Sequence, residues 1–236
     1  MHKDPQKIAL IPAYNPDRRL LAVLRDLSDS GYFTVLVNDG SDMKYQPIFD
    51  AAGRADVILT HEDNLGKGMA LKTGLRWIAG HFTQPCTVVT VDADGQHRIK
   101  DIESVAAVAG EHPDTFVIGS RRLRGSVPFR SRSGNFFTRT VLHALTPVTV
   151  YDTQSGLRAF SLSLVPLLAE TEGERYEYEM RVLIELTKRK VPIVETGIEA
   201  VYIGNNSSSH FKTVSDAKRV YKVIFQAAGN KNKKQK

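Results

Sequence analysis

The sequence predicts an α/β fold in which a doubly wound, mostly parallel sheet carries helices on both faces. Short apolar runs alternate with segments of helical periodicity through the first half of the chain, which is the pattern of successive strand–helix units. The length of 236 residues suits one such domain or two small ones. Polar residues repeatedly follow the apolar runs, and ligands of doubly wound sheets bind beyond the carboxyl ends of the strands.

The expected elements succeed one another at short intervals. Strands are expected at residues 8–13, 34–37, 57–60, 87–91 and 116–119, with further extended chain at 192–203. The first helix is expected to be capped by Asn15, to have Pro16 in its first turn and to end at Gly31. Further helices are expected at 66–78, 99–109 and 214–228, the last with a capping box from Thr213 and Asp216.

Composition narrows the class of protein. The single cysteine, Cys86, excludes an internal disulfide and fits a reducing cytoplasm. Residues 1–7 lack the apolar core of a secretory signal, and the longest uncharged stretch, 77–91, is shorter than the roughly 20 apolar residues of a spanning helix. We therefore expect a cytoplasmic protein that does not cross a membrane.

The net charge of +6 is unevenly distributed along the chain. Between Asp114 and Asp152 there is no acidic residue, and the arginines of this segment are Arg121, Arg122, Arg124, Arg130, Arg132 and Arg139. Guanidinium groups bind phosphate oxygens in pairs, so this arginine segment predicts an anionic ligand. Residues 230–236 form a second basic cluster, expected to be a disordered tail.

Two acids separated by one residue carry the strongest chemical signal. Asp92 and Asp94 follow an apolar strand, where a turn lets their carboxylates converge. Like charges held together repel unless a cation neutralises them, and Mg²⁺ or Mn²⁺ favours oxygen ligands and phosphate partners. Gln96 offers a further carbonyl oxygen. The alternative is a polar turn with two solvated acids, which the position after a buried strand argues against.

Two further polar motifs lie at strand ends in the first half, Pro12-Ala13-Tyr14-Asn15 and Asn38-Asp39-Gly40-Ser41. The ring of Tyr14 can stack on a base, and Asp39 can accept hydrogen bonds from base N–H groups. Ordinary turn chemistry explains each residue singly but not the recurrence on neighbouring strands. At Asn64-Leu65-Gly66-Lys67-Gly68, free amides at a helix start and one lysine suit an anion.

Together these motifs resemble family 2 glycosyltransferases, most closely the dolichyl-phosphate mannose synthase-like branch, whose bacterial members transfer sugar to undecaprenyl phosphate. The resemblance spans roughly residues 7–212 and includes Asp92-Ala93-Asp94-Gly95-Gln96-His97, Gly119-Ser120-Arg121 and Ser155-Gly156. It departs from the family where Pro16 replaces a common Glu and Asn38 a common Asp. No Gln-x-x-Arg-Trp occurs, which argues against a processive polysaccharide synthase.

The resemblance implies a GT-A fold and a divided set of site residues. Metal would be held by Asp92, Asp94 and Gln96. The nucleotide would contact Pro12, Ala13, Tyr14, Asn15, Asp39, Lys67, Asp92 and Ala93. Arg121 and Arg132 match arginines placed near donor and acceptor phosphates, and Glu179 matches an acid near the acceptor. We also expect Arg130, Ser155 and His210 on the acceptor side. His210 belongs to Ser209-His210-Phe211, a motif that often closes such domains.

The expected reaction is inverting transfer of a hexose from a UDP- or GDP-linked sugar to polyprenyl phosphate. The metal and arginines would stabilise the leaving diphosphate, and an ionised acceptor phosphate needs little base catalysis. A sugar or protein hydroxyl acceptor would instead need a general base, with Asp152 or Glu179 as candidates. A sugar-nucleotide nucleotidyltransferase is disfavoured because Pro12-Ala13-Tyr14-Asn15 stands where its Gly-rich loop should be.

A non-enzymatic anion- or nucleic-acid-binding module and an inactive transferase are the remaining alternatives. The chain lacks basic and aromatic interleaving of a known nucleic-acid-binding type, and its acidic motif is intact. We expect a catalytic domain at 1–212, an amphipathic helix at 213–229 and the tail at 230–236. The basic helix and tail predict peripheral contact with the inner face of the plasma membrane.

Overall fold

The structure, a computed structural model, describes residues 6–121 and 150–199. Its strands are β1 (Lys7–Ala13), β2 (Phe33–Asp39), β3 (Val57–His61), β4 (Thr87–Thr90), β5 (Phe116–Ser120), β6 (Arg158–Ser161) and β7 (Ile193–Gly197). They form one sheet in the order β3-β2-β1-β4-β6-β5-β7. Only β6 runs antiparallel to its neighbours β4 and β5, and the other described pairings are parallel.

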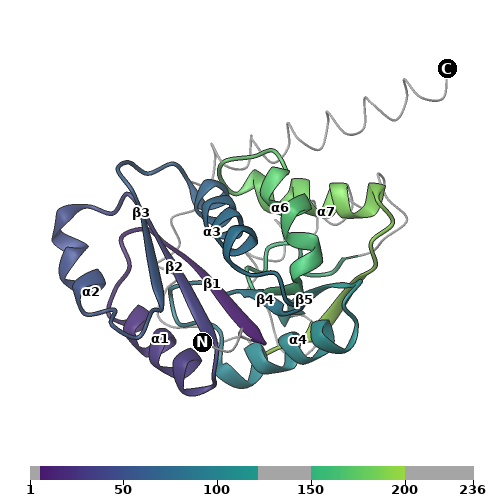
Figure 1. Ribbon diagram of the computed structural model, residues 1–236, viewed down its shortest axis with the longest axis horizontal. Coiled ribbons are helices and arrows are strands. Elements are labelled where there is room, and N and C mark those ends of the chain that lie inside the picture. Colours follow the sequence, from purple (N-terminus) through teal and green to yellow (C-terminus); the bar gives the residue numbers. More distant parts are fainter. Residues whose placement is uncertain (1–5, 122–149, 200–236) are drawn as a thin grey trace.

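Helices cover both faces of this sheet (Figure 1). They are α1 (Arg19–Asp29), α2 (Gln46–Asp50), α3 (Lys67–His81), α4 (Ile99–Glu111), α6 (Val165–Glu170) and α7 (Glu177–Lys188), with short 3-10 turns at Met43–Tyr45 and Leu162–Leu164. Helices α1 and α4 lie on one face, and α3, α6 and α7 lie on the other. This confirms the doubly wound, mostly parallel α/β fold.

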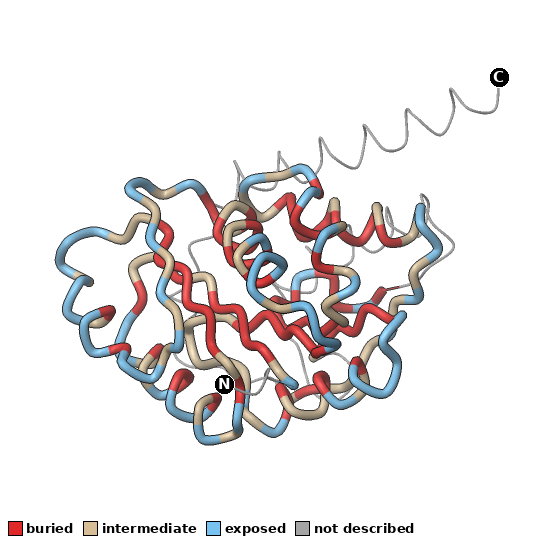
Figure 2. The backbone as a smooth tube through the Cα atoms, viewed as in Figure 1, coloured by how far each residue is buried: buried red, intermediate tan, exposed pale blue. Residues whose placement is uncertain are grey.

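Alternate residues of the central strands feed two separate cores. Ile8 and Leu10 of β1 point to the α3, α6 and α7 side, whereas Ala9 and Ile11 point to the α1 and α4 side. Both cores are buried in the middle of the molecule, and the exposed residues are concentrated in the loops and outer helix turns (Figure 2). Central strands buried on both faces read as continuous apolar runs, which is why the sequence located them.

The expected start of the first helix is wrong. Helix α1 begins at Arg19, whose backbone N–H is accepted by the Asp17 carboxylate at 2.9 Å. Asn15 has a positive φ of 48° and turns away to bond Ser41 and Asp42 after β2, at 2.9 and 3.2 Å. Asn15 therefore joins the ends of β1 and β2 instead of capping a helix.

The other expected strands and helices of the described ranges are present, with boundaries shifted by a few residues. β6, α2, α6 and α7 were not anticipated. Arg130, Arg132 and His210 lie outside the described residues, as do the expected helix at 213–229 and the tail at 230–236. No helix within residues 6–121 and 150–199 is long and apolar enough to span a membrane.

Candidate active site

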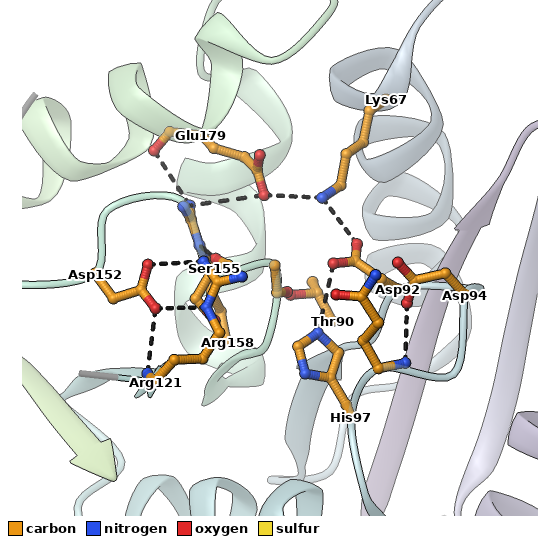
Figure 3. A network of polar contacts seen from close by, with 12 residues as sticks. Lys67, Thr90, Asp92, Asp94, His97, Arg121, Asp152, Ser155, Arg158 and Glu179 are labelled. Carbon is orange, nitrogen blue, oxygen red and sulfur yellow. Dashed lines mark hydrogen bonds and ion pairs between the residues drawn. The ribbon is translucent and has the colours of Figure 1, made fainter. Parts of the chain in front are cut away.

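The sheet brings its chemically important residues to one edge. β4 ends at Thr90, directly before Val91 and Asp92, and β5 ends at Ser120, directly before Arg121. β6 runs antiparallel to β4 and starts with Arg158 opposite Thr90. Residues 152–157 consequently lie between Arg121 and Asp92. Figure 3 shows Asp152 next to Arg121, and Gly156 of the same loop lies against Asp92. Thr90 fixes this arrangement by donating its hydroxyl to the carbonyl of Gly156 at 2.8 Å.

Asp92 lies at the centre of the site and contacts two basic side chains. Its Oδ1 is 2.9 Å from Lys67 Nζ, and its Oδ2 is 3.4 Å from His97 Nε2. Burial by itself would raise the pKa of Asp92, but the neighbouring Lys67 and His97 outweigh it and hold that pKa well below its usual range. Asp92 is therefore an anion at neutral pH.

Asp94 is the second acid of the predicted pair. Its Oδ1 accepts the backbone N–H of Gln96 at 3.0 Å, which fixes the turn after Asp92. Burial and the adjacent Asp92 carboxylate raise the pKa of Asp94 above its usual value. The two carboxylates therefore repel each other, as expected of a pair arranged to share a cation.

The carboxylates of Asp92 and Asp94 fit a hard cation that takes its remaining oxygen ligands from water and substrate. Among residues 6–121 and 150–199, no three His, Cys, Asp or Glu side chains are grouped to hold an ion. Mg²⁺ is commonly bound through one or two protein carboxylates together with water and substrate phosphates. Asp92 and Asp94 match this mode.

Lys67 joins the acid pair to α7. Its Nζ lies 2.9 Å from Asp92 Oδ1 and 3.2 Å from Glu179 Oε1. Burial would lower the pKa of Lys67, but Asp92 and Glu179 together raise it above its usual value, so the ammonium stays charged. Glu179 also lies 3.9 Å from Arg158 Nη2. The sequence predicted an anionic ligand at Lys67, and in this structure two carboxylates of the chain itself contact its ammonium.

Arg158 holds the loop of residues 152–157, which lies in space between Arg121 and Asp92. It is 4% exposed, and its guanidinium donates to the carbonyls of Ser155, Thr153 and Glu179 at 3.0, 3.2 and 3.2 Å. Ser155 lies in this loop with a buried hydroxyl that has no hydrogen-bond partner among the described residues. The loop approaches Asp92 so closely that a Cβ on Gly156 would lie 2.3 Å from Asp92 Oδ2.

Arg121 forms an ion pair with an acidic side chain. This corrects the expectation that no nearby acid neutralises the charge of the arginine segment. Its Nε and Nη2 donate to the two oxygens of Asp152 at 2.8 and 3.0 Å. Asp152 is fully buried, and the Glu195 carboxylate of β7 accepts the backbone N–H groups of Tyr151 and Asp152 at 2.8 and 2.9 Å. A distant stretch of chain thus supplies the acid that the local sequence lacks.

Asp39 is buried and anchors the turn before α3. Its oxygens accept the N–H groups of Leu65 and Gly66 at 3.0 and 2.9 Å, and Oδ1 lies 2.8 Å from His61 Nδ1. The free amides expected at residues 64–68 do bind an anion, and that anion is Asp39. Contact of Asp39 with a nucleotide base stays a prediction.

The remaining candidates lie at the same edge. Pro12 and Ala13 end β1, and Tyr14 follows them, half-buried beside Asn15. Ala93 and Gln96 are half-buried in the turn after β4. Their roles in nucleotide and metal binding also stay predictions.

Sequence reasoning missed Arg158 and Glu195 as parts of this site, and it quoted His97 and Gly156 within motifs without assigning either a role. A charged residue inside the apolar run Leu157-Arg158-Ala159-Phe160 is the one signal that pointed to Arg158. The contacts of Gly156 and Glu195 depend on the position of β6 and β7 in the sheet, which no local pattern reveals.

Comparison with known proteins identifies the family. The model of "Glycosyl transferase family 2" matches residues 8–165. A UDP-N-acetylglucosamine–dolichyl-phosphate N-acetylglucosaminyltransferase of Methanococcus voltae is 29% identical over 241 residues, covering 93% of this chain and 95% of its own. An uncharacterized protein of Methanocaldococcus jannaschii is 30% identical over 223 residues, covering 92% and 90%.

Solved structures share the fold. Glucosyl-3-phosphoglycerate synthase of Mycobacterium tuberculosis, in complex with Mn²⁺, UDP-glucose and phosphoglyceric acid, superimposes with a TM-score of 0.71 at 20% identity, over 96% of this chain and 80% of its own. Mannosyl-3-phosphoglycerate synthase of Rubrobacter xylanophilus gives 0.68 at 16% identity, over 98% and 75%. These neighbours bear out the GT-A architecture expected from the sequence. With an acid pair at the end of β4 and a family match across most of the sheet, the chain belongs to glycosyl transferase family 2 and is a glycosyltransferase.

Proposed function

We propose that this glycosyltransferase moves a hexose from a UDP- or GDP-linked sugar to a polyprenyl phosphate, with inversion at the anomeric carbon. The observation that carries the proposal is the half-buried pair Asp92 and Asp94, which follows β4 at the carboxyl end of the sheet. A Mg²⁺ or Mn²⁺ ion held there supplies positive charge for the diphosphate that leaves with the nucleotide. The M. tuberculosis neighbour, solved with Mn²⁺ and UDP-glucose, supports this choice of ligands.

The chain's own residues have separate tasks in this reaction. Asp92 and Asp94 hold the cation, with Gln96 beside them. Arg121, oriented by both oxygens of Asp152, brings the positive charge of its guanidinium to the carboxyl end of β5, where it can attract phosphate oxygens. Tyr14, Asp39 and Lys67 stay our candidates for the nucleotide side, and Ser155, Arg130, Arg132 and His210 for the acceptor side.

A phosphate acceptor fits the site better than a hydroxyl acceptor. A hydroxyl must lose a proton, and the candidate bases are Asp152 and Glu179. Both oxygens of Asp152 accept hydrogen bonds from Arg121, and its side chain is 1% exposed. Glu179 is paired with Lys67. A phosphate is already ionised near neutral pH and needs neither group as a base. The dolichyl-phosphate substrate named for the M. voltae relative supports the same acceptor class.

Transfer of radiolabelled sugar tests the proposal. The purified protein with Mn²⁺ is incubated with labelled UDP-N-acetylglucosamine, UDP-glucose or GDP-mannose and with dolichyl or undecaprenyl phosphate in detergent. We expect label in the organic-extractable lipid with one of these donors, and its loss in EDTA. Polyprenol without phosphate is the matched acceptor control and should stay unlabelled.

Water-soluble acceptors are assayed in parallel. Label that appears only on a free sugar, a protein hydroxyl or 3-phosphoglycerate would overturn the polyprenyl-phosphate acceptor while leaving the glycosyltransferase activity intact. For a hydroxyl acceptor, Asp152 and Glu179 would then return as candidate bases.

A further inference from the structure

The feature that the proposed reaction does not explain is the shared position of Lys67. Its ammonium lies between two carboxylates of different elements, Asp92 after β4 and Glu179 on α7, at 2.9 and 3.2 Å. The side chain of Lys67 is 18% exposed, and those of Asp92 and Glu179 are 29% and 10% exposed. In such a partly dry setting these contacts are screened less than surface ion pairs.

Lys67 competes with any cation for Asp92. An ammonium 2.9 Å from Asp92 Oδ1 uses a lone pair of a proposed metal ligand and repels a second positive charge at the same carboxylate. The acid pair is therefore already partly neutralised before a metal ion arrives. Removal of this ammonium would leave the repulsion between the Asp92 and Asp94 carboxylates less neutralised, and would therefore raise the affinity of the pair for a divalent ion.

Glu179 offers the Lys67 ammonium a second carboxylate as an ion-pair partner. Its Oε1 already contacts Lys67, and its position is fixed by Arg158, which donates to the Glu179 backbone carbonyl at 3.2 Å and lies 3.9 Å from Oε1. A small shift of the Lys67 ammonium toward Glu179 would free Asp92 without leaving a buried charge unpaired. The start of α3 need not move, because Asp39 holds the preceding turn.

We propose that Lys67 is an internal counter-ion that moves from Asp92 to Glu179 when the divalent cation binds, so that the Lys67–Glu179 pair sets the metal affinity of the site. The inference rests on the proposed metal site at Asp92 and Asp94. Lys67 and Glu179 act as positioning residues in this scheme, and the first turn of α7 becomes coupled to cation binding.

Mn²⁺ titration followed by electron paramagnetic resonance tests this without any sugar donor. Lys67→Met keeps the aliphatic stem and removes the charge, so it should bind Mn²⁺ about tenfold more tightly or better than wild type. Glu179→Gln should bind it several-fold more weakly, because Lys67 then remains on Asp92. Lys67→Arg keeps the charge and should stay close to wild type. Lys188→Met removes an exposed charge near the other end of α7 and should change nothing.

A double-mutant cycle separates the movement of Lys67 from simple charge effects. If Glu179 acts through Lys67, Glu179→Gln should lose most of its effect in the Lys67→Met background. Equal effects of Glu179→Gln in both backgrounds would overturn the proposal, as would unchanged or weaker Mn²⁺ binding by folded Lys67→Met. Absence of Mn²⁺ binding by the wild-type protein would instead refute the metal site itself.

Discussion

Substitution of Gly156 by alanine should damage the metal site without unfolding the protein. A Cβ at this position would lie 2.3 Å from Asp92 Oδ2 and 2.6 Å from Oδ1. Ordinary contact begins near 3.4 Å, so the carboxylate must withdraw by about 1.1 Å. The loop itself is held by Thr90 and Arg158, so the Asp92 side chain is the part that yields. Misplacement of a catalytic group by about 1 Å lowers rates by about 10²-fold.

The assay compares Mn²⁺ affinity, turnover and the midpoint of thermal unfolding in wild type, Gly156→Ala and Gly80→Ala. We expect the Gly156 variant to bind Mn²⁺ at least about tenfold more weakly, as befits a displaced ligand, and to lose about 10²-fold in turnover. Gly80 lies in α3 with open space around its Cβ position, so alanine there should leave the site intact. Wild-type Mn²⁺ affinity and turnover in a folded Gly156→Ala protein would refute the role assigned to the loop.

Three further substitutions follow from the same contacts. Asp94→Asn should abolish most turnover and, in EDTA at pH 7, raise the unfolding midpoint. Because the pKa of Asp94 is raised on folding, its stabilising contribution is present below the unfolded value of 3.8 and lost as pH rises through the folded pKa. The gain should therefore vanish on acidification, and a gain that is independent of pH would contradict this. Asp39→Ala should lower the free energy of unfolding by about 2–4 kcal/mol in urea titrations, since the amides of Leu65 and Gly66 and the ring of His61 lose their shared partner. Weaker nucleotide binding with unchanged stability would mean that Asp39 contacts the base and is not an anchor. Arg158→Met should lower the free energy of unfolding by about 3–5 kcal/mol, because three backbone carbonyls and the Glu179 carboxylate lose a buried partner. A loss below about 1 kcal/mol would show that the loop of residues 152–157 does not depend on Arg158.

The part of the fold that sequence predicts best is the part with strong local signals. β1, β2 and β4 are short apolar runs buried on both sides, and α3 and α4 show helical periodicity between them. β6 escaped prediction because its four residues include a charge and follow a segment without periodicity. The start of α1 was misplaced because Asn15 has the chemistry of a cap but uses it on the loop after β2.

The arginine segment illustrates a different limit. Counting charges along the chain gives Arg121 no acidic neighbour, whereas the fold supplies Asp152 from 31 residues away. Likewise Lys67 looks like a free cation at a helix start until Asp92 and Glu179 close around it. Charge balance in a buried site depends on distances in space, so linear spacing does not determine it.

The sequence alone predicted the α/β class and singled out the acid pair Asp92 and Asp94, because strand periodicity and a compact motif are local properties of the chain. The glycosyltransferase activity was expected from the resemblance of several such motifs to one family. The tertiary structure decided which charges meet. The antiparallel return of β6 brings Arg158 and Gly156 to Asp92, and α7 brings Glu179 to Lys67. Electrostatic pairing falls off with distance and is strengthened by burial, and both quantities exist only once the chain has folded.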